Sequence, residues 1–333
     1  MDGLGVVVIG RNEGERLVRS LESVLDAAET VVYVDSGSAD GSQRAARALG
    51  AEVVELDPSR PFTAARARNA GFARLRELAP GTAFVQFVDG DCEVDPRWLL
   101  AGFAFLQAHD DVALVCGMLE ERHPDASIYN KLCALEWRLP PGDTRTTGGI
   151  FMARAAAFEA LNGLDEGLIA GEEPDLCIRL RKAEWRLHRL PETMAVHDAA
   201  MQSFRQWWTR CVRNGHAAAE GWMRHGDPPE RYKAKEVGSS VAWGGLVPLM
   251  FIGCAAYGFL APLAWLGAVG LGGAAVAQGW RIQVGRRKRG DAPKEARLYA
   301  VFCMLAKIPE TLGIAQFFLN RLRNRQSELI EYK

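Results

Sequence analysis

Two aspartates separated by one glycine, Asp89 and Asp91, follow directly on an apolar run at 84–88. Carboxylates on both sides of a glycine can face one side of a sharp turn and offer oxygen ligands to a hard divalent cation. Such a cation would neutralise charge on a departing diphosphate. An exposed turn without chemistry is the alternative, and the position after a buried strand favours the metal site. His197, beside Asp198, is a candidate third metal contact, although a single histidine is more often structural.

A second acidic group consists of Glu172, Glu173 and Asp175. Like charges at short range raise one another's pKa, which suits one of them to act as a general base. The alternative is an ordinary first turn of a helix, where acidic side chains are favoured by the helix dipole and a proline such as Pro174 is tolerated. All three carboxylates are candidate catalytic groups.

Polar residues suited to ligand binding follow two other predicted strands. Asp35 ends an apolar run and can accept hydrogen bonds from a base or a ribose. Arg66, Arg68 and Asn69 begin a predicted helix, and arginine forks match the oxygens of a pyrophosphate. A solvated basic helix face is the alternative for this second group.

Alternating strands and helices would position these side chains. Short β-branched runs predict strands at 4–9, 30–34, 51–56 and 83–88, and helices are predicted at 15–28, 42–49, 63–78 and 96–108. This order indicates an α/β domain with a mainly parallel sheet flanked by helices. Ligands of such sheets bind beyond the carboxyl ends of the strands, so Asn12, Glu13 and Asp35 should meet the aspartate turn there. Residues 184–190 and 194–197 predict edge strands.

Composition limits the possible partners and compartments. The net charge is −1, so we expect no nucleic acid partner. The seven cysteines are scattered without a CxxC pair, which predicts reduced core thiols and gives no support to a zinc site or a thioredoxin-like function. The chain enters a predicted strand at once, so no secretory signal is expected.

Five motifs, in their order along the chain, resemble those of the family 2 glycosyltransferases with the GT-A fold. They are the strand and Asn-Glu turn at 7–13, Asp-Ser-Gly-Ser-Ala-Asp-Gly-Ser at 35–42, Ala-Arg-Asn-Ala-Gly at 67–71, Asp-Gly-Asp at 89–91 and Glu-Glu-Pro-Asp-Leu-Cys-Ile-Arg at 172–179. The resemblance covers about residues 4–200. Ser36 departs from the family pattern, which usually has a second aspartate there, and Glu173 stands where the family often has aspartate.

The resemblance implies an inverting transfer from a nucleotide-sugar donor, most simply a UDP-sugar, with Mg²⁺ or Mn²⁺ at Asp89 and Asp91. It implies that Glu173 deprotonates the acceptor, with Glu172 and Asp175 as alternates. It implies that Glu13 and Asp35 hold the nucleoside. Other residues expected to bind the donor are Asn12, Arg68, Asn69, Gly148 and Gly149.

The C-terminal part is apolar. We divide the chain into a catalytic domain at 1–230 and a membrane region at 231–333, with a transmembrane hairpin at 241–259 and 261–279 because each stretch is near the length that spans a bilayer. The basic run at 286–289 predicts that the catalytic domain is cytoplasmic, at an inner membrane. Residues 298–319 carry charges that are costly in hydrocarbon and predict an interfacial helix. A soluble protein with a buried hairpin is the alternative.

Together these features predict an enzyme that glycosylates a lipid-linked or saccharide acceptor near membrane lipids, in cell-envelope or exopolysaccharide biosynthesis. A polyprenyl-phosphate acceptor is an alternative, in which a phosphate oxygen attacks and no strong base is needed. A nucleotidyltransferase is a further alternative, but it would want a glycine-rich phosphate loop that residues 10–13 do not form. A non-catalytic scaffold would not need the acidic groups.

Overall fold

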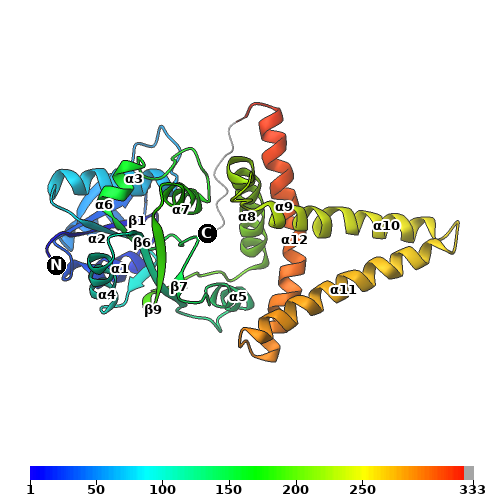
Figure 1. The fold of residues 1–333 in the computed structure, drawn as a ribbon. Helices are drawn as coiled ribbons and strands as arrows, with labels where there is room; N and C mark the ends of the chain where they lie inside the picture. The colour runs from blue at the N-terminus through cyan, green and yellow to red at the C-terminus, as the bar shows by residue number, and fades with distance from the viewer. Residues whose placement is uncertain (326–333) are drawn as a thin grey trace. The chain divides into compact units, whose positions relative to one another are not determined.

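The computed structural model describes residues 1–325 and divides the chain into two compact units, Met1–Ala200 and Met201–Lys333. The division falls before the boundary that we expected at residue 230. The helix α8 (Phe204–His225) belongs to the second unit because it packs along α12 (Pro293–Leu322). The first unit is an α/β domain and the second is helical (Figure 1).

A nine-stranded sheet forms the centre of the first unit, in the order β3-β2-β1-β4-β8-β6-β9-β5, with β7 paired to β9. Its strands are β1 (Leu4–Gly10), β2 (Thr30–Asp35), β3 (Glu52–Glu55), β4 (Phe84–Asp89), β5 (Cys92–Val94), β6 (Val112–Glu121), β7 (Gly142–Asp143), β8 (Phe151–Arg154) and β9 (Arg186–His197). The four strands predicted first are mutually parallel, as expected. Beyond them β8 runs antiparallel to both of its neighbours, so the complete sheet is mixed.

The helices of this unit follow the predicted alternation. They are α1 (Glu15–Leu25), α2 (Ser42–Ala48), α3 (Ala64–Leu78), α4 (Trp98–Ala108), α5 (Ile128–Glu136), α6 (Ala155–Ala160) and α7 (Glu172–Lys182). The α1 helix buries one face, with Leu17, Leu21 and Val24 completely covered. The fold class predicted from the alternation is confirmed.

The prediction of two edge strands near residues 184–197 is wrong. These residues form the single long strand β9, which lies between β6 and β5 inside the sheet. Pro191 and Glu192 sit at its middle, where the pairing with β6 shifts register between Cys116 and Met118. The irregularity makes one continuous strand read as two short segments in the sequence.

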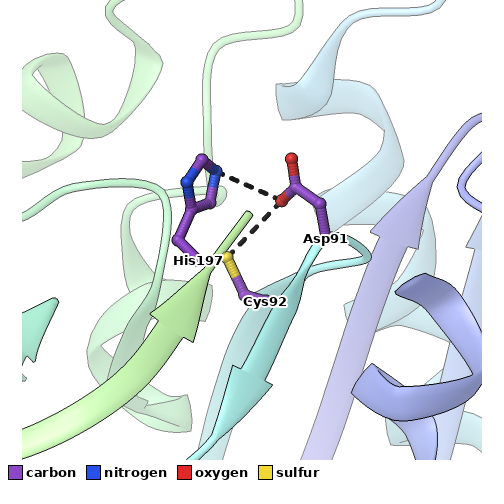
Figure 2. Close-up of side chains that lie close together, drawn as sticks. All are labelled: Asp91, Cys92 and His197. Atoms are coloured by element: carbon purple, nitrogen blue, oxygen red, sulfur yellow. Dashed lines mark hydrogen bonds and ion pairs between the residues drawn. The ribbon is translucent and has the colours of Figure 1, made fainter. Parts of the chain in front are cut away.

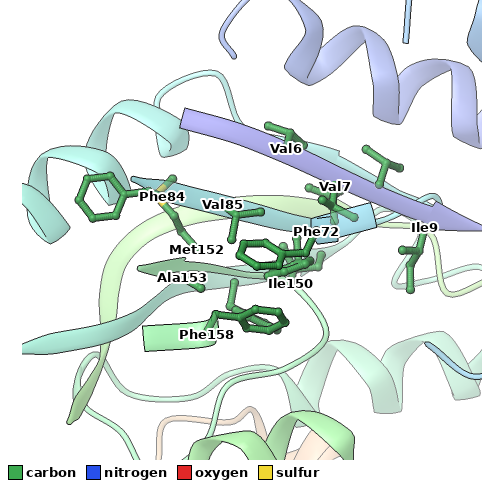
Figure 3. Packing of buried hydrophobic residues seen from close by; sticks show 14 of the residues in the cluster. Val6, Val7, Ile9, Phe72, Phe84, Val85, Ile150, Met152, Ala153 and Phe158 are labelled. Carbon is green, nitrogen blue, oxygen red and sulfur yellow. The ribbon is translucent and has the colours of Figure 1, made fainter. Parts of the chain in front are cut away.

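The core beneath the sheet is built from aliphatic strand residues and a group of aromatic rings, shown in Figure 3. Phe72 and Phe158 meet edge to face with ring centroids 4.8 Å apart. Gly71 explains why α3 lies so close to the strands, because a Cβ there would stand 2.3 Å from Val7 Cγ1 and 2.8 Å from Val34 Cγ2. The close approach packs the middle of α3 against β1 and β2.

The helical unit contains α8, α9 (Ala234–Ser240), the π-helical segment η1 (Val241–Leu246), α10 (Val247–Tyr257), α11 (Ala264–Lys288) and α12. α9, η1 and α10 run on as one helix, and α10 and α11 form a hairpin. The hairpin tip is apolar and open to solvent, with Phe259, Leu260 and Leu263 each about four-fifths exposed. Within the described residues the hairpin is therefore not buried, contrary to the alternative of a soluble protein with a buried hairpin.

By length and composition alone, two helices within residues 1–325 are suited to cross a membrane: Ala234–Tyr257 and Pro293–Leu322. The first overlaps most of the predicted span 241–259. The second contains residues 298–319, which we expected to lie on the membrane surface. α11, with the predicted span 261–279, is not one of the two, because its many glycines and Gln278 lower its mean hydropathy.

The charged groups of α12 that argued against a span are paired inside the helical unit. Lys307 Nζ lies 2.7 Å from Glu310 Oε2, and Ser240 Oγ donates to the same oxygen at 2.6 Å. Thr311 Oγ1 donates to the Ser240 carbonyl at 2.6 Å. Paired and hydrogen-bonded charges are much less costly in an apolar setting than isolated ones.

Candidate active site

The parallel strands bring two aspartates to the same edge of the sheet. In the strand register Asp35 of β2 stands beside Gly10 of β1, and Asp89 of β4 stands beside Ile9. Both carboxylates therefore lie at the carboxyl end of β1, where the alternation of strands and helices predicts a ligand site.

Arg68 links three carboxylates at this edge. Its guanidinium is almost completely buried and lies 2.7 Å from Asp89 Oδ1, 3.1 Å from Glu172 Oε1 and 3.2 Å from Glu173 Oε1. Burial opposes the charged form of Arg68, but the carboxylates of Asp89, Glu173 and Glu172 together raise its pKa above the ordinary value. We call these four residues the Arg68 cluster.

Glu173 is the member of the Arg68 cluster best suited to take a proton. Burial is the main reason that its pKa rises from 4.5 to about 7, and the neighbouring Glu172 carboxylate adds to the effect. The positive charge of Arg68 offsets part of the rise. A carboxyl group with a pKa near neutrality is well matched to general base catalysis.

The alternates for the base differ from Glu173 in burial or in partner. Glu172 shares the Arg68 guanidinium with Glu173 but is more deeply buried. Asp175 Oδ2 accepts a hydrogen bond from Arg179 Nε at 2.7 Å, and that arginine also donates to the carbonyls of Leu161 and Gly163. These contacts favour Glu173 over Glu172 and Asp175.

The two glycines expected near the donor differ in their surroundings. A Cβ on Gly149 would stand 2.7 Å from both Arg68 Nη2 and Asp89 Oδ2, so this backbone lies directly against the Arg68 cluster. Gly148 has open space around it. The loop that carries both is attached to α7, where the Thr147 amide donates to Cys177 Sγ at 3.4 Å.

Asp91 lies on the other side of the same turn and faces His197. His197 Nε2 is 3.3 Å from Asp91 Oδ1, and Cys92 Sγ is 3.4 Å from that oxygen (Figure 2). The aspartate is buried and the histidine is mostly so. The turn at 89–91 thus joins the Arg68 cluster, through Asp89, to a carboxylate–imidazole pair, through Asp91.

The donor set around Asp91 fits a divalent cation. A buried carboxylate and an imidazole nitrogen face each other at ligand spacing, and both accept Mn²⁺ and similar metals. The role of His197 as a third metal contact stays a prediction. Asp89, the other predicted ligand, has one oxygen 2.7 Å from Arg68 Nη2, so its carboxylate is shared with the Arg68 cluster.

Asp35 is completely buried and organises the loop that follows it. Its Oδ2 accepts from the amides of Gly37 and Ser38 and from Gln43 Nε2 at 2.8–2.9 Å, and its Oδ1 accepts from Tyr33 Oη at 2.8 Å. Burial and the Asp35 charge raise the pKa of Tyr33, so its hydroxyl stays a donor. The contact of Asp35 with a nucleoside stays a prediction.

Asn12 and Glu13 shape the edge of the site. Asn12 has a φ of 56°, and its side chain accepts from the Ala39 amide at 2.8 Å, which ties the loop after β1 to the loop after β2. Glu13 pairs with Arg16 at 2.7 Å and lies beside Gly90 of the aspartate turn. Both residues are therefore near the predicted nucleoside position.

Asn69 braces a neighbouring loop. Its Nδ2 donates to the Leu164 carbonyl at 2.8 Å, and its Oδ1 accepts from the Leu164 amide at 3.0 Å. Arg66 is likewise engaged, by the carbonyls of Asp57, Arg60 and Pro61. Neither contact points to a pyrophosphate, so the donor-binding role of Asn69 stays a prediction.

Two residues at this site were missed from the sequence. Cys92 was counted only among scattered thiols, although its position directly after the aspartate turn was a usable signal. Glu121 lies behind His197, with its Oε2 3.9 Å from His197 Nδ1 and accepting from the Ala199 amide. No sequence signal pointed to Glu121, because only the pairing of β6 with β9 brings it to the histidine.

A sheet with this strand order and an Asp-x-Asp turn at its ligand edge defines a domain of the GT-A class. Residues 5–153 match the model of "Glycosyl transferase family 2". The chain belongs to glycosyltransferase family 2 through this domain.

Curated relatives agree with this family. Over 239 residues the chain is 30% identical to the pre-mycofactocin glycosyltransferase of Mycobacterium tuberculosis, a match that covers 67% of this chain and 48% of the relative. It is 25% identical over 236 residues to glycosyltransferase AglE of Haloferax volcanii, covering 66% of this chain and 74% of that protein. The chain thus spans about half the length of the mycobacterial relative it matches.

Solved structures share the fold. The mannosyltransferase PcManGT of Pyrobaculum calidifontis, in complex with GDP-Man and Mn²⁺, aligns with a TM-score of 0.56 over 97% of this chain and 87% of its own, at 18% identity. Glucosyl-3-phosphoglycerate synthase of M. tuberculosis, in complex with Mn²⁺, UDP and glucosyl-3-phosphoglycerate, aligns with a TM-score of 0.51 over 68% of this chain and 80% of its own, at 18% identity.

Proposed function

We propose that this protein is a membrane-associated, metal-dependent inverting glycosyltransferase that moves a sugar from a nucleotide-sugar donor to a lipid-linked or membrane-proximal acceptor. One observation carries the proposal: the turn at 89–91 joins a base with a raised pKa, through Arg68, to a carboxylate–imidazole pair. Transfer needs both functions, a proton acceptor and a charge stabiliser for the diphosphate.

Asp91 and His197, with Asp89, would hold Mg²⁺ or Mn²⁺, which when bound neutralises charge on the diphosphate of the donor. Glu173 accepts the proton of the acceptor hydroxyl as the acceptor oxygen bonds to the anomeric carbon of the donor sugar. The bond from that carbon to the nucleoside diphosphate breaks at the same time, and the diphosphate leaves from the opposite face. Arg68 keeps Glu173 in place, and the lack of a side chain at Gly149 lets its backbone lie directly against Arg68 and Asp89. A UDP-sugar is the first donor to test, with GDP-sugars second.

The acceptor class decides how much Glu173 matters. A hydroxyl must lose its proton as it attacks, so a base contributes about 10²–10⁴-fold to the rate. A polyprenyl phosphate attacks through an oxygen that is already ionised, and the base is then dispensable. The raised pKa of Glu173 favours the hydroxyl acceptor over the phosphate.

Membrane association is supported by the exposed apolar hairpin and by the helices Ala234–Tyr257 and Pro293–Leu322. An acceptor held in a membrane would then lie where the enzyme does. We propose that α10 and α11 cross the inner membrane as a hairpin, which returns the basic residues at 286–289 to the side of the catalytic unit. Such residues stay on the cytoplasmic side, so the catalytic unit would be cytoplasmic. Cell-envelope or exopolysaccharide synthesis is the process that this placement fits.

The test is a panel of UDP- and GDP-sugars offered to the full-length protein in detergent, with Mn²⁺, Mg²⁺ or chelator. We expect one donor to be hydrolysed or transferred only with metal, and Asp91→Ala to abolish the reaction. Glu173→Gln should lower transfer to a hydroxyl by at least about 100-fold. Asp125→Ala, at an exposed surface pair, is the matched control and should leave the rate unchanged.

The outcomes separate the alternatives. Activity that survives chelation and Asp91→Ala would remove the metal-dependent mechanism. Activity that needs metal but survives Glu173→Gln would point to the phosphate acceptor. Release of diphosphate from a nucleoside triphosphate, with no use of nucleotide sugars, would point to the nucleotidyltransferase.

A further inference from the structure

Cys92 is part of the donor set around Asp91. The antiparallel pairing of β5 with β9 places Cys92 directly opposite His197, and residues in such a pair project from the same face of the sheet. Asp91 Oδ1 lies 3.4 Å from Cys92 Sγ and 3.3 Å from His197 Nε2. Figure 2 shows the thiol, the carboxylate and the imidazole turned toward one another.

The spacing of these atoms matches a single small cation. Zn²⁺ binds thiolate sulfur at about 2.3 Å and imidazole nitrogen or carboxylate oxygen at about 2.0–2.2 Å, so tetrahedral ligands stand roughly 3.4–3.6 Å apart. All three donor atoms lie within 4.8 Å of one another. Small rotations of these side chains would place the three donor atoms at three corners of a tetrahedron around one cation.

The thiol of Cys92 gives the site a preference among divalent metals that a carboxylate alone would not give. Mg²⁺ and Mn²⁺ prefer oxygen ligands, whereas thiolate ligands select Zn²⁺ and other soft cations. We propose that Asp91, Cys92 and His197 form a three-ligand site for Zn²⁺, overlapping the site at which Asp91 and His197 would hold Mg²⁺ or Mn²⁺. The proposal rests on the metal role given above to Asp91 and His197, but binding needs neither donor nor acceptor.

The surroundings support a site of this kind. All three residues have little exposed surface, and the His197 ring is held edge-on by Trp137 with centroids 4.7 Å apart. Glu121 lies 3.9 Å from His197 Nδ1, and His197 Nε2 is the nitrogen that faces Asp91. Carboxylates behind a histidine commonly fix its orientation toward a metal.

Three protein ligands leave a fourth position, which is the arrangement of zinc sites that also bind water or substrate. Zinc binding would break the Cys92 S–H bond and release that proton to solvent, without any change of oxidation state. Zn²⁺ and Mn²⁺ would compete for the same carboxylate and imidazole. Zinc should therefore displace manganese from this protein far more effectively than it would from a site without sulfur.

Cys92→Ser separates this proposal from a simple hydrogen bond, because a hydroxyl can still donate to Asp91 but is a poor ligand for a soft metal. The full-length metal-free protein is loaded with Co²⁺ as a spectroscopic probe, and bound Mn²⁺ is followed by electron paramagnetic resonance while Zn²⁺ is added. We expect wild type to show thiolate-to-cobalt charge-transfer absorption that Cys92→Ser lacks. We expect Zn²⁺ to displace Mn²⁺ at a concentration at least tenfold lower in wild type.

Controls keep the result specific. Cys254→Ser removes a more exposed thiol outside the site and should behave as wild type. His197→Ala should weaken both metals. X-ray absorption of the zinc-loaded wild type should show one sulfur neighbour at about 2.3 Å, which tests the proposal even if Cys92→Ser folds poorly.

Equal zinc affinity in wild type and Cys92→Ser, or a zinc spectrum with only nitrogen and oxygen neighbours, would overturn the proposal. Failure of every sugar donor would overturn the proposed function and leave these binding results as they are. Zinc binding through sulfur in wild type, together with intact Mn²⁺-dependent transfer in Cys92→Ser, would support both the zinc site and the proposed function.

Discussion

Each unit of the protein holds a cationic side chain next to carboxylate, fully buried in the catalytic unit and partly buried in the helical unit, and the two arrangements are balanced differently. In the catalytic unit Arg68 faces three carboxylates, those of Asp89, Glu172 and Glu173. In the helical unit Lys307 faces the single carboxylate of Glu310, and the hydroxyl of Ser240 also donates to it. The first cluster has an excess of negative charge and the second has none.

The difference explains what each cluster does. Burial is the main cause that raises the pKa of Glu173 to about 7, and the excess negative charge of the cluster adds to it. Perturbed groups of this kind gather at functional sites. The Lys307–Glu310 pair is balanced one to one and has a further hydrogen bond from Ser240, so neither group has an excess charge to neutralise. The pairing lets charged residues remain in an apolar helix. We therefore propose a chemical role for the Arg68 cluster and a packing role for the Lys307–Glu310 pair.

Removal of Arg68 should have the largest effect. Arg68→Met leaves three neighbouring carboxylates without a counter-charge, and breaking buried ion pairs costs about 3–5 kcal/mol. We expect the free energy of unfolding of the catalytic unit to fall by at least that amount, measured by denaturant titration. Arg74→Met, on the exposed side of the same helix with its pairs to Glu52 and Glu77, is the control and should cost under about 1 kcal/mol. Similar losses in both variants would mean that Arg68 is not special.

The pH dependence of the reaction should follow Glu173. A general base works in its ionised form, so the transfer rate with a hydroxyl acceptor should rise as pH increases through about 7 and then level off. The sign for stability is opposite. The folded pKa lies above 4.5, so the contribution of Glu173 is fully present below 4.5 and is lost as pH rises toward about 7.

Glu173→Gln separates these two effects. The variant should be nearly inactive, and its stability relative to wild type should increase between pH 5 and pH 8, by on the order of 1–3 kcal/mol. Activity and unfolding are measured at the same pH values. A wild-type rate that is flat from pH 6 to pH 8 would argue against Glu173 as the base.

The balanced pair should behave as a unit. Lys307→Met and Glu310→Gln each leave one group without its partner and should lower the melting temperature in detergent, with a cost on the order of 3 kcal/mol. The double variant should cost less than the sum, because the two residues interact. Transfer activity should change only a few-fold in all three. Strictly additive losses would show that the pair is not coupled.

The parallel half of the fold followed from its sequence because each strand is a short β-branched run ending at a polar turn. The predicted starts of β1, β2 and β4 agree with the structure to within about one residue. β9 could not be read in this way, because its pairing with β6 shifts register in mid-strand and hides its continuity. The membrane part was predicted in kind, but hydropathy selects α12 rather than α11 as the second candidate span.

The acidic edge of the site was predictable for the same reason, since parallel strands carry their carboxyl ends to one place. The resemblance named Glu173 as the base, with Glu172 and Asp175 as alternates, and that assignment stays a prediction. The sequence did not indicate that Arg68 contacts both Glu172 and Glu173 while Arg179 contacts Asp175. Cys92 follows the aspartate turn directly, which was a usable signal, but its place opposite His197 comes from the pairing of β5 with β9. Glu121 became visible only through the pairing of β6 with β9. Cross-strand neighbours of this kind carry no local signal in the chain.

The close contact of α8 with α12 tests the packing role that we give to the Lys307–Glu310 pair, with the smallest expected effect. A Cβ on Gly215 of α8 would stand 2.0 Å from the Glu310 carbonyl oxygen, and one on Gly313 of α12 would stand 2.0 Å from that of Val212. Gly253 in α10 has open space around it. Gly215→Ala should therefore force α8 and α12 apart and cost about 1–3 kcal/mol.

The same substitution at Gly253 should have the opposite sign. Alanine is a better helix former than glycine by about 1 kcal/mol, and at Gly253 nothing opposes that gain. The two variants thus share one chemical change and differ only in what the added methyl group meets. Melting temperatures in detergent should fall for Gly215→Ala and stay level or rise for Gly253→Ala. If both changed alike, the intimate contact of α8 with α12 would not exist in the folded protein, and the Lys307–Glu310 pair beside it would lose its packed surroundings.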